Sequence, residues 1–382
     1  MQPTIFLVAG EASGDVLGAR LMVALATLRP GLRFAGIGGP HMAEQGLSSL
    51  FPMRELAVMG LVEVLPKIRA LSRRLRQTAD EIARTRPDLV VTIDSPGFTL
   101  RLLRRIALLG IPRVHYVAPQ VWAWREHRVR EFPGLWERLL CLLPFETAFF
   151  AQHGLEARFT GHPVLQSGAD HGDGAAFRAR HGIALNAPVV MLMPGSRRSE
   201  APRLLPVFGA TVRRLARTHP DLAVVVAASP VVSATVLRMS RRWPVAPIIV
   251  TETRDKHDAF AASGAALTKS GTSTLELALA GVPMAVTYRV NPLTAAIARR
   301  LIRVKHVAMV NLLAGRTLVP ELLQQDCRPT RLAATLAHLL DDNAAASTQR
   351  AGFRDVLNRL RPETGTPAEA AAREILAVLD RP

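Results

Sequence analysis

Unbroken apolar segments of strand length, each followed by a turn and a helix-like stretch, constrain this fold more than any other feature of the sequence. Five such segments lie in the first half and five in the second: Ile5–Ala9, Arg33–Ile37, Leu89–Ile93, Arg113–Val117, Leu139–Leu143, Val189–Met193, Leu222–Ala227, Ile248–Val250, Ala265–Thr268 and Pro283–Thr287. Strands that are continuously apolar, and that alternate with helices, indicate a parallel sheet covered on both faces. We therefore predict an α/β fold.

The pattern lapses once, in a polar, glycine-rich stretch after residue 166, and then restarts. A chain of 382 residues is also too long for one typical domain. We predict two doubly wound, Rossmann-like domains, residues 1–165 and 186–360, that face a central cleft. Residues 361–382 form a C-terminal helix that packs back on the first domain or on a partner chain. Ligands of open parallel sheets bind beyond the carboxyl ends of the strands, so the turns there are the candidate sites.

The positive charge of the chain limits its partners. The net charge is +17, but only four of the 48 basic residues are lysine, so part of the excess reflects an arginine-rich composition. The basic clusters at 67–86, 101–105, 125–138 and 299–305 are not interleaved with aromatic residues, which argues against single-stranded nucleic acid. An anionic lipid surface or a phosphorylated substrate suits these clusters, and so do ordinary solvated helix faces.

Cysteine content and hydropathy predict a soluble or peripheral protein of a reducing compartment. Cys141 and Cys327 lie far apart in apolar surroundings and do not suit a disulfide framework. The first residues lack the basic region and long apolar core of a signal peptide. Charges or prolines interrupt every apolar run before it is long enough to span a bilayer.

Two turns of the first domain carry residues suited to chemistry. The turn after the first strand, "GEASGD", contains Ser13 and Gly14 and is either a capped turn or an anion-binding turn. The turn after the third strand, "DSPGF", begins with Asp94. Asp94 is either an ordinary turn residue or a general base that takes a proton from a hydroxyl nucleophile.

Two further features of the first domain fit either a lipid-like substrate or a packed core. Trp122 and Trp124 lie two residues apart beside a basic stretch, where their rings can line a sugar or acyl site or pack inside the domain. The segment 58–76 places its apolar residues near one helical face and its arginines elsewhere. Interfacial helices have this pattern, and so do helices that face a core.

Two turns of the second domain predict a phosphate site. "PGSRRSE" (194–200) offers a glycine for close backbone approach and the planar guanidinium of Arg197 to bind a phosphate; the alternative is a solvated surface turn. "LTKSGTSTLELALAGVPM" (267–284) predicts a strand, a tight turn, a short helix and the next strand. The start of that helix favours a diphosphate, and Glu276, one turn inside, can accept hydrogen bonds from ribose hydroxyls. Together these turns predict a nucleotide-sugar site.

The motifs occur in the order seen in one known family. The chain resembles lipid-A-disaccharide synthases in segments that extend over nearly its whole length: "VAGEASGD" (8–15), "ELAVMGLVEVL" (55–65), "APQVWAWRE" (118–126), "LPFE" (143–146), "GHPV" (161–164), "PGSR" (194–197), "GTSTLE" (271–276) and "NLLAGR" (311–316). The "PGSR" and "GTSTLE" elements are shared more loosely by other glycosyltransferases with two Rossmann domains (GT-B type) and by nucleotide-sugar 2-epimerases.

The resemblance implies an inverting glycosyltransferase. Its reaction would transfer 2,3-diacylglucosamine from the UDP derivative to the 6-hydroxyl of 2,3-diacylglucosamine 1-phosphate, giving the β-1,6 lipid A disaccharide 1-phosphate and UDP. The resemblance also implies a cytoplasmic enzyme, peripheral at the inner membrane, without a required metal or other cofactor. The charge pattern predicts no nucleic-acid partner. The sequence does not decide between a monomer and a homodimer.

The resemblance also assigns roles to residues. Asp94 matches the base, and Arg197, Glu276 and Asn311 match donor-binding positions. The remaining candidates lie in the quoted motifs or, for Ser270, directly before one. They are Gly195, Ser196, Ser270, Gly271 and Thr272 on the donor side, and Ser13, Gly14, Met59, Trp122, Trp124 and Arg125 on the acceptor and lipid side. Family members often read Asp-x-Pro-Asp-Phe-Asn in the base loop, where this chain has Gly97 and Thr99, so Asp94 is the loop's only acid.

Two other functions are compatible with the motifs. A UDP-sugar 2-epimerase would use acids and a histidine to abstract a proton at carbon 2, and it would convert its substrate without an acceptor. A nucleotide-binding protein at a membrane surface would bind UDP without forming product. The motifs of the first domain favour the transferase over the epimerase, and the cluster of polar residues at the loop ends of both domains favours it over a binding protein.

Overall fold

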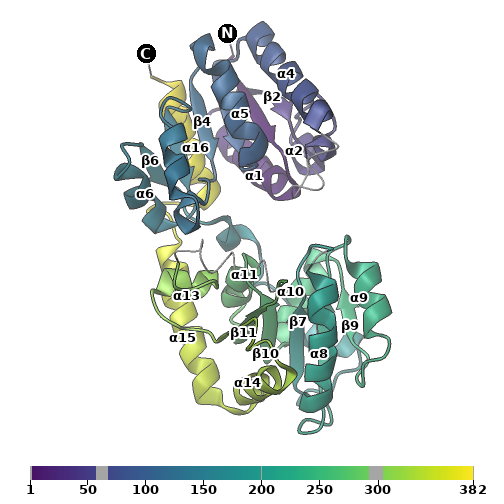
Figure 1. The fold of residues 1–382 in the computed structure, drawn as a ribbon. Coiled ribbons are helices and arrows are strands. Elements are labelled where there is room, and N and C mark those ends of the chain that lie inside the picture. Colours follow the sequence, from purple (N-terminus) through teal and green to yellow (C-terminus); the bar gives the residue numbers. More distant parts are fainter. Residues whose placement is uncertain (1, 57–67, 199, 292–303, 382) are drawn as a thin grey trace. The chain divides into compact units, whose positions relative to one another are not determined.

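The computed structural model describes residues 2–56, 68–198, 200–291 and 304–381. The chain divides into two compact units, which we call unit 1 (Met1–Pro163 with Leu360–Pro382) and unit 2 (Val164–Arg359). Each unit consists of a parallel sheet flanked by helices (Figure 1). The predicted fold class, two doubly wound α/β sheets, is confirmed.

The sheet of unit 1 has six parallel strands in the order β2-β1-β3-β4-β5-β6. Their bounds are β1 (Thr4–Ala9), β2 (Arg33–Ile37), β3 (Leu89–Ile93), β4 (Arg113–Tyr116), β5 (Arg138–Cys141) and β6 (Ala157–Phe159). The first five coincide closely with predicted segments, whereas the edge strand β6 has only three residues, none of them fully buried, and was missed. The strand order reverses at β1 and β3, whose last residues, Ala9 and Ile93, are paired.

Helices cover both faces of this sheet, which explains why its strands are continuously apolar. They are α1 (Ala12–Leu28), α2 (Pro40–Glu44), α4 (Ile68–Thr85), α5 (Pro96–Ile106), α6 (Pro144–Ala151) and α16 (Pro367–Leu379). In β1, Leu7 belongs to the core formed with α1 and α16, and its neighbour Phe6 belongs to the core formed with α4 and α5. Successive residues of a strand point to opposite faces, so both must be apolar here.

The C-terminal helix α16 packs in unit 1, where it lies beside α1 (Figure 1). Ala371, Ala372 and Ile375 are fully buried in the core shared with β1 and α1. The chain leaves unit 1 at the "GHPV" motif and re-enters it at Leu360. The two crossings are adjacent, since the His162 N–H donates to the Leu360 carbonyl at 3.0 Å.

Unit 2 repeats the architecture with the strand order β12-β11-β10-β7-β8-β9. Its strands are β7 (Val189–Met193), β8 (Ala223–Ala227), β9 (Ile248–Val250), β10 (Ala265–Lys269), β11 (Met284–Tyr288) and β12 (Glu321–Leu323). Its helices are α7 (Gly174–Arg180), α8 (Ala201–Leu215), α9 (Ser233–Ser240), α10 (Thr253–Ala262), α11 (Ser273–Leu279), α13 (Met309–Ala314), α14 (Pro329–Asp341) and α15 (Asn343–Arg359). The order reverses between β7 and β10, and ligands of such sheets bind at this point.

Two predictions about the environment of the chain can be compared with these units. Within the described ranges, no helix combines the length and the apolar character needed to cross a bilayer. Residues 58–67 of the segment 58–76, which include Met59, lie outside the described part of the chain. Further along it, Leu71 and Leu75 pack against the core of unit 1, while Ile68 is 45% exposed. The described half of this segment is therefore an amphipathic surface helix, with two leucines toward the core and its other face exposed.

Candidate active site

Asp94 begins the turn at the carboxyl end of β3, next to the turn that Gly10 begins after β1. Asp94 and Ser95 have φ angles of +51° and +48°, a left-handed conformation that is strained for residues other than glycine. The Asp94 N–H donates to the Tyr116 carbonyl at 2.8 Å, and the Thr99 hydroxyl donates to the Asp94 carbonyl at 2.7 Å. The turn is thus held from two sides, in a conformation that projects a carboxyl group at the switch point.

The environment of the Asp94 carboxyl group makes it a stronger base. Burial raises its pKa above the usual value, and a hydrogen bond from the Ser95 N–H partly offsets that rise. The two positions where this chain departs from the family pattern have different surroundings. A side chain at Gly97 would meet no atom within 4 Å, so space for a second acid exists but is unused. Thr99 instead supports the turn, since its hydroxyl also donates to the Ser95 carbonyl at 3.0 Å.

The "GEASGD" turn leads into α1, but its Asp15 side chain caps the start of another helix, α2. The Asp15 carboxylate is buried and accepts hydrogen bonds from the N–H groups of Gly39 (2.8 Å), His41 (3.0 Å) and Met42 (3.0 Å), at the start of α2. Gly14 is buried against the end of β3, where a Cβ would be in ordinary van der Waals contact, 3.6 Å from the Ile93 carbonyl oxygen. Ser13 is exposed beside them.

The two tryptophans of "APQVWAWRE" have different environments. Trp122 Nε1 donates to Glu146 Oε1 at 3.0 Å, and its ring meets Phe145 edge-on at 4.9 Å between centroids. Trp124 is 45% exposed, and the Arg125 guanidinium lies 3.8 Å from the centre of its ring. Trp122 therefore anchors this loop, while Trp124 and Arg125 present an amphipathic surface to solvent.

Glu146 is a buried acid to which the sequence analysis gave no role. Its second oxygen, Oε2, accepts from the Leu143 N–H at 3.0 Å, at the start of α6. Burial raises its pKa to about 7. The signal was present in "LPFE", because a glutamate three residues after the residue that precedes a helix forms a capping box. Its bond to Trp122 could not be read from that motif.

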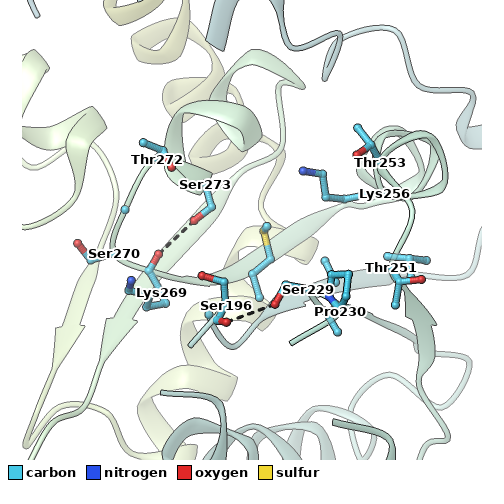
Figure 2. A pocket seen from close by; sticks show the side chains of 16 residues that line it. Ser196, Ser229, Pro230, Thr251, Thr253, Lys256, Lys269, Ser270, Thr272 and Ser273 are labelled. Carbon is cyan, nitrogen blue, oxygen red and sulfur yellow. Dashed lines mark hydrogen bonds between the residues drawn. The ribbon is translucent and has the colours of Figure 1, made fainter. Parts of the chain in front are cut away.

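A pocket with a cavity volume of 340 Å³ lies at the switch point of unit 2 (Figure 2). The turns after β7, β8, β9 and β10 all contribute to it. Its lining includes five of the predicted donor-side residues, Gly195, Ser196, Ser270, Gly271 and Thr272, together with Ser229, Thr251, Thr253, Lys256, Lys269 and Ser273. Arg197 follows the lining residue Ser196 directly and is 55% exposed in its side chain.

Two lysine–glutamate pairs place charge at this pocket. Lys256 Nζ lies 3.2 and 3.1 Å from the two carboxylate oxygens of Glu276, which ties the predicted ribose-binding acid to a lining residue. Lys269 Nζ lies 3.1 Å from Glu200 Oε1. Neither Lys256 nor Glu200 was predicted from the sequence. The sequence carried a signal for the lysines alone, because Lys256 and Lys269 are two of only four lysines in an arginine-rich chain.

The polar turns of the pocket are braced by their own hydroxyl groups. Ser229 Oγ donates to the Ser196 carbonyl at 3.3 Å, which joins the turns after β7 and β8 (Figure 2). Ser270 Oγ donates to the Val307 carbonyl at 2.5 Å, and Ser273 Oγ lies 3.0 Å from Thr268 Oγ1. The hydroxyl groups therefore hold the turns in place, which fixes the polar backbone groups around the cavity.

Asn311 lies apart from the pocket lining. It is fully buried, and its Oδ1 accepts from the N–H groups of Leu318 (2.7 Å) and Val319 (2.8 Å). Its Nδ2 donates to the Val319 carbonyl at 2.9 Å and to Glu321 Oε1 at 2.8 Å. Glu321 also accepts from the Val307 N–H, in the segment that Ser270 contacts. Asn311 thus connects to the pocket through this network.

Two comparisons decide the family of the chain. A family model described as lipid-A-disaccharide synthetase matches residues 5–375. The chain is also 64% identical, over 378 residues, to the lipid-A-disaccharide synthase of Gluconobacter oxydans (strain 621H). The aligned region covers 99% of this chain and 91% of that protein. The chain belongs to the lipid-A-disaccharide synthase family. The resemblance inferred from the sequence motifs is confirmed, and the chain is an enzyme of the glycosyltransferase class.

Solved structures with the same fold are more distant in sequence. A UDP-GlcNAc 2-epimerase from Neisseria meningitidis, bound to UDP-GlcNAc, has a TM-score of 0.65 at 13% identity and covers 98% of this chain and 99% of its own. A calicheamicin glycosyltransferase has a TM-score of 0.63 at 18% identity and covers 100% of this chain and 99% of its own. At such identities the likeness shows the fold alone, so the 2-epimerase alternative is supported only by a structural neighbour.

Metal binding has no candidate cluster among the described residues, where no group of three or more His, Cys, Asp or Glu side chains is arranged to hold an ion. The charges at the pocket of unit 2 come instead from lysine, arginine and glutamate side chains.

Proposed function

We propose that this protein transfers 2,3-diacylglucosamine from its UDP derivative to the 6-hydroxyl of 2,3-diacylglucosamine 1-phosphate. The products are the β-1,6-linked lipid A disaccharide 1-phosphate and UDP. The observation that carries the proposal is the pocket at the switch point of unit 2, because the family segments "PGSR" and "GTSTLE" form its walls. Family membership supplies the reaction, and the pocket supplies a place for the nucleotide.

The donor's UDP group fits this pocket by charge and by hydrogen bonding. Its diphosphate would lie near Lys269 and the turn at Ser270–Thr272, where N–H groups at the start of α11 add donors. Arg197 can bind a phosphate oxygen with its planar fork. Glu276, fixed by Lys256, can accept hydrogen bonds from the ribose hydroxyls. Asn311 would act indirectly, by holding the segment that Ser270 contacts.

Asp94 would act as the general base. It accepts the proton of the acceptor's 6-hydroxyl while the hydroxyl oxygen attacks the anomeric carbon and the bond to UDP breaks. Attack from the face opposite to UDP inverts that carbon without a covalent enzyme intermediate. The raised pKa of Asp94 suits this task, since a stronger base removes a hydroxyl proton more readily. General-base assistance of this kind is worth about 10²–10⁴ in rate.

The negative charge that develops on the leaving UDP needs stabilisation. Lys269 and Arg197 are cations at or next to the pocket and supply it without a metal ion in the mechanism. Preorganised charges of this kind stabilise the transition state more than the ground state, because the leaving oxygen gains charge as the bond breaks.

In this proposal, unit 1 binds the acceptor and contacts the membrane surface. Trp124 and Arg125 are exposed together and can contact a phosphorylated, acylated sugar, beside the braced Trp122. The exposed arginine face of α4 suits an anionic lipid surface, which would place the enzyme peripherally on the cytoplasmic side of the inner membrane. Ser13, Gly14 and Met59 complete the proposed acceptor side.

An acceptor-dependence assay tests the proposal. Purified protein is incubated with UDP-2,3-diacylglucosamine, with and without 2,3-diacylglucosamine 1-phosphate, and UDP and disaccharide are measured by mass spectrometry. The proposal predicts UDP and disaccharide only when the acceptor is present. Conversion of the UDP-sugar without acceptor would support a 2-epimerase, and no product with intact UDP binding would support a nucleotide-binding protein.

A further inference from the structure

Beside the proposed diphosphate site lies a buried carboxylate that the mechanism above does not use. Glu200 directly precedes α8, and its side chain is only 6% exposed. Its Oε1 atom lies 3.1 Å from Lys269 Nζ and 3.4 Å from Arg197 Nη1. One buried carboxylate oxygen therefore contacts the two cations that the proposed function assigns to the diphosphate.

The "PGSR" turn is shaped around this carboxylate. Gly195 has a φ angle of +98°, and a Cβ at this position would lie 2.6 Å from Glu200 Oε2 and 3.3 Å from Lys269 Cδ. The missing side chain at Gly195 thus makes room for the Glu200–Lys269 pair. Glu200 Oε2 is itself buried without a hydrogen-bond partner among the described residues. Such an oxygen opposes folding, so a role in stability alone does not account for it.

Charge alone does not explain Glu200 either. A carboxylate next to an anion site repels the anion, and the repulsion is stronger where the surroundings are dry. If Glu200 acted only through its charge, it would weaken the binding of a diphosphate. Glu200 can instead hold the two cationic side chains in place before the diphosphate binds. Lysine and arginine have long side chains that lose much conformational freedom when they are fixed, and this loss then occurs before binding.

We propose that Glu200 is a positioning residue of the donor site, which holds Lys269 and Arg197 so that both cations face the diphosphate of the UDP-sugar. The inference rests on the proposed function of the pocket. The Lys269 ammonium nitrogen lies 3.1 Å from Glu200 Oε1 and 5.7 Å from the centre of the Tyr288 ring. An ammonium group has three N–H donors, so contact with one carboxylate oxygen leaves donors for phosphate.

UDP binding to the full-length protein tests this role, measured by titration calorimetry. Glu200→Gln keeps the volume of the side chain and removes its charge. Positioning predicts that the Kd for UDP rises roughly 10- to 100-fold, the effect of losing one charge-assisted hydrogen bond. A role through charge alone predicts the opposite, tighter binding. Unchanged or tighter binding of UDP by Glu200→Gln would overturn the inference.

A double-mutant cycle with Lys269→Met separates positioning from general destabilisation. If Glu200 acts through Lys269, Glu200→Gln should weaken UDP binding much less in the Lys269→Met background than in wild type. Fully additive effects would contradict this. Asp221→Asn removes one exposed carboxylate elsewhere on unit 2 and should leave the Kd unchanged.

Two further measurements keep the result interpretable. If Glu200→Gln does not fold, Glu200→Asp keeps the charge but withdraws the carboxylate by one methylene, and positioning still predicts weaker UDP binding. Unchanged affinity in Glu200→Asp would then count against the inference. If the wild-type protein does not bind UDP, both the proposed function and this inference fail. If wild type binds UDP and Glu200→Gln binds equally well, this inference alone fails.

Discussion

Replacing Glu146 with glutamine should remove a pH dependence that this buried carboxyl group imposes on the stability of unit 1. Burial raises its pKa from 4.5 to about 7, although hydrogen bonds from Trp122 Nε1–H and the Leu143 N–H favour the carboxylate. The folded state therefore binds this proton more tightly than the unfolded state does. The stabilisation is fully present below pH 4.5 and is lost as the pH rises to about 7.

The size of the effect follows from the shift. At about 1.4 kcal/mol per pKa unit, the shift corresponds to about 3 kcal/mol between acid and neutral pH. The free energy of unfolding of wild type minus that of Glu146→Gln should fall by about this amount between pH 4.5 and pH 7.5. His115 and His162, whose pKa values burial lowers to about 3 and about 4, have the opposite pH dependence. They are present in both proteins and cancel in the difference.

Urea unfolding followed by tryptophan fluorescence measures this difference in unit 1. Three of the four tryptophans, Trp122, Trp124 and Trp136, belong to unit 1, so a Trp243→Phe background removes the signal of unit 2. Glu363→Gln, at an exposed position of unit 1, serves as the control and should show no such change. A difference between wild type and Glu146→Gln that stays constant from pH 4.5 to pH 7.5 would refute the reasoning.

Two other predictions concern packing and the membrane. Ile375→Ala should destabilise unit 1 by about 2–4 kcal/mol, because Ile375 of α16 is fully buried against the core of β1 and α1. The same fluorescence assay measures it, and a loss below about 0.5 kcal/mol would show that α16 is dispensable. Charge reversal at Arg69 and Arg73 should reduce flotation with anionic liposomes. Arg74 is left intact because its Nε bonds Glu55 at 2.7 Å, and unchanged flotation would argue against α4 as the lipid-facing surface.

Much of the fold was predictable because the physical constraint acts locally. Phe6 and Leu7 pack on opposite faces of one sheet, so both must be apolar, and the pattern is visible without knowledge of the partners. β6 and β12 were not predictable in this way. Each has three residues at a sheet edge and none is fully buried, so neither leaves an apolar run.

The candidate site was predictable where it follows from strand ends. Ser196 and the turn at Ser270–Thr272 follow β7 and β10, and the prediction that such turns meet requires only a parallel sheet. The side-chain pairs were not predictable. Glu200 lies far from Lys269 in the sequence, and Glu146 far from Trp122, and only the strand order brings them together.

If unit 1 supplies the general base and unit 2 binds the nucleotide, a change at the base should leave nucleotide binding intact. Asp94→Asn is the suitable change, because asparagine tolerates the left-handed conformation that Asp94 adopts and cannot accept the proton. Turnover at saturating substrates and the Kd for UDP are measured on the same preparation. We expect a kcat lower by a factor of about 10²–10⁴ with an unchanged Kd for UDP. Near wild-type turnover, or a loss of UDP affinity that parallels the loss of turnover, would contradict it.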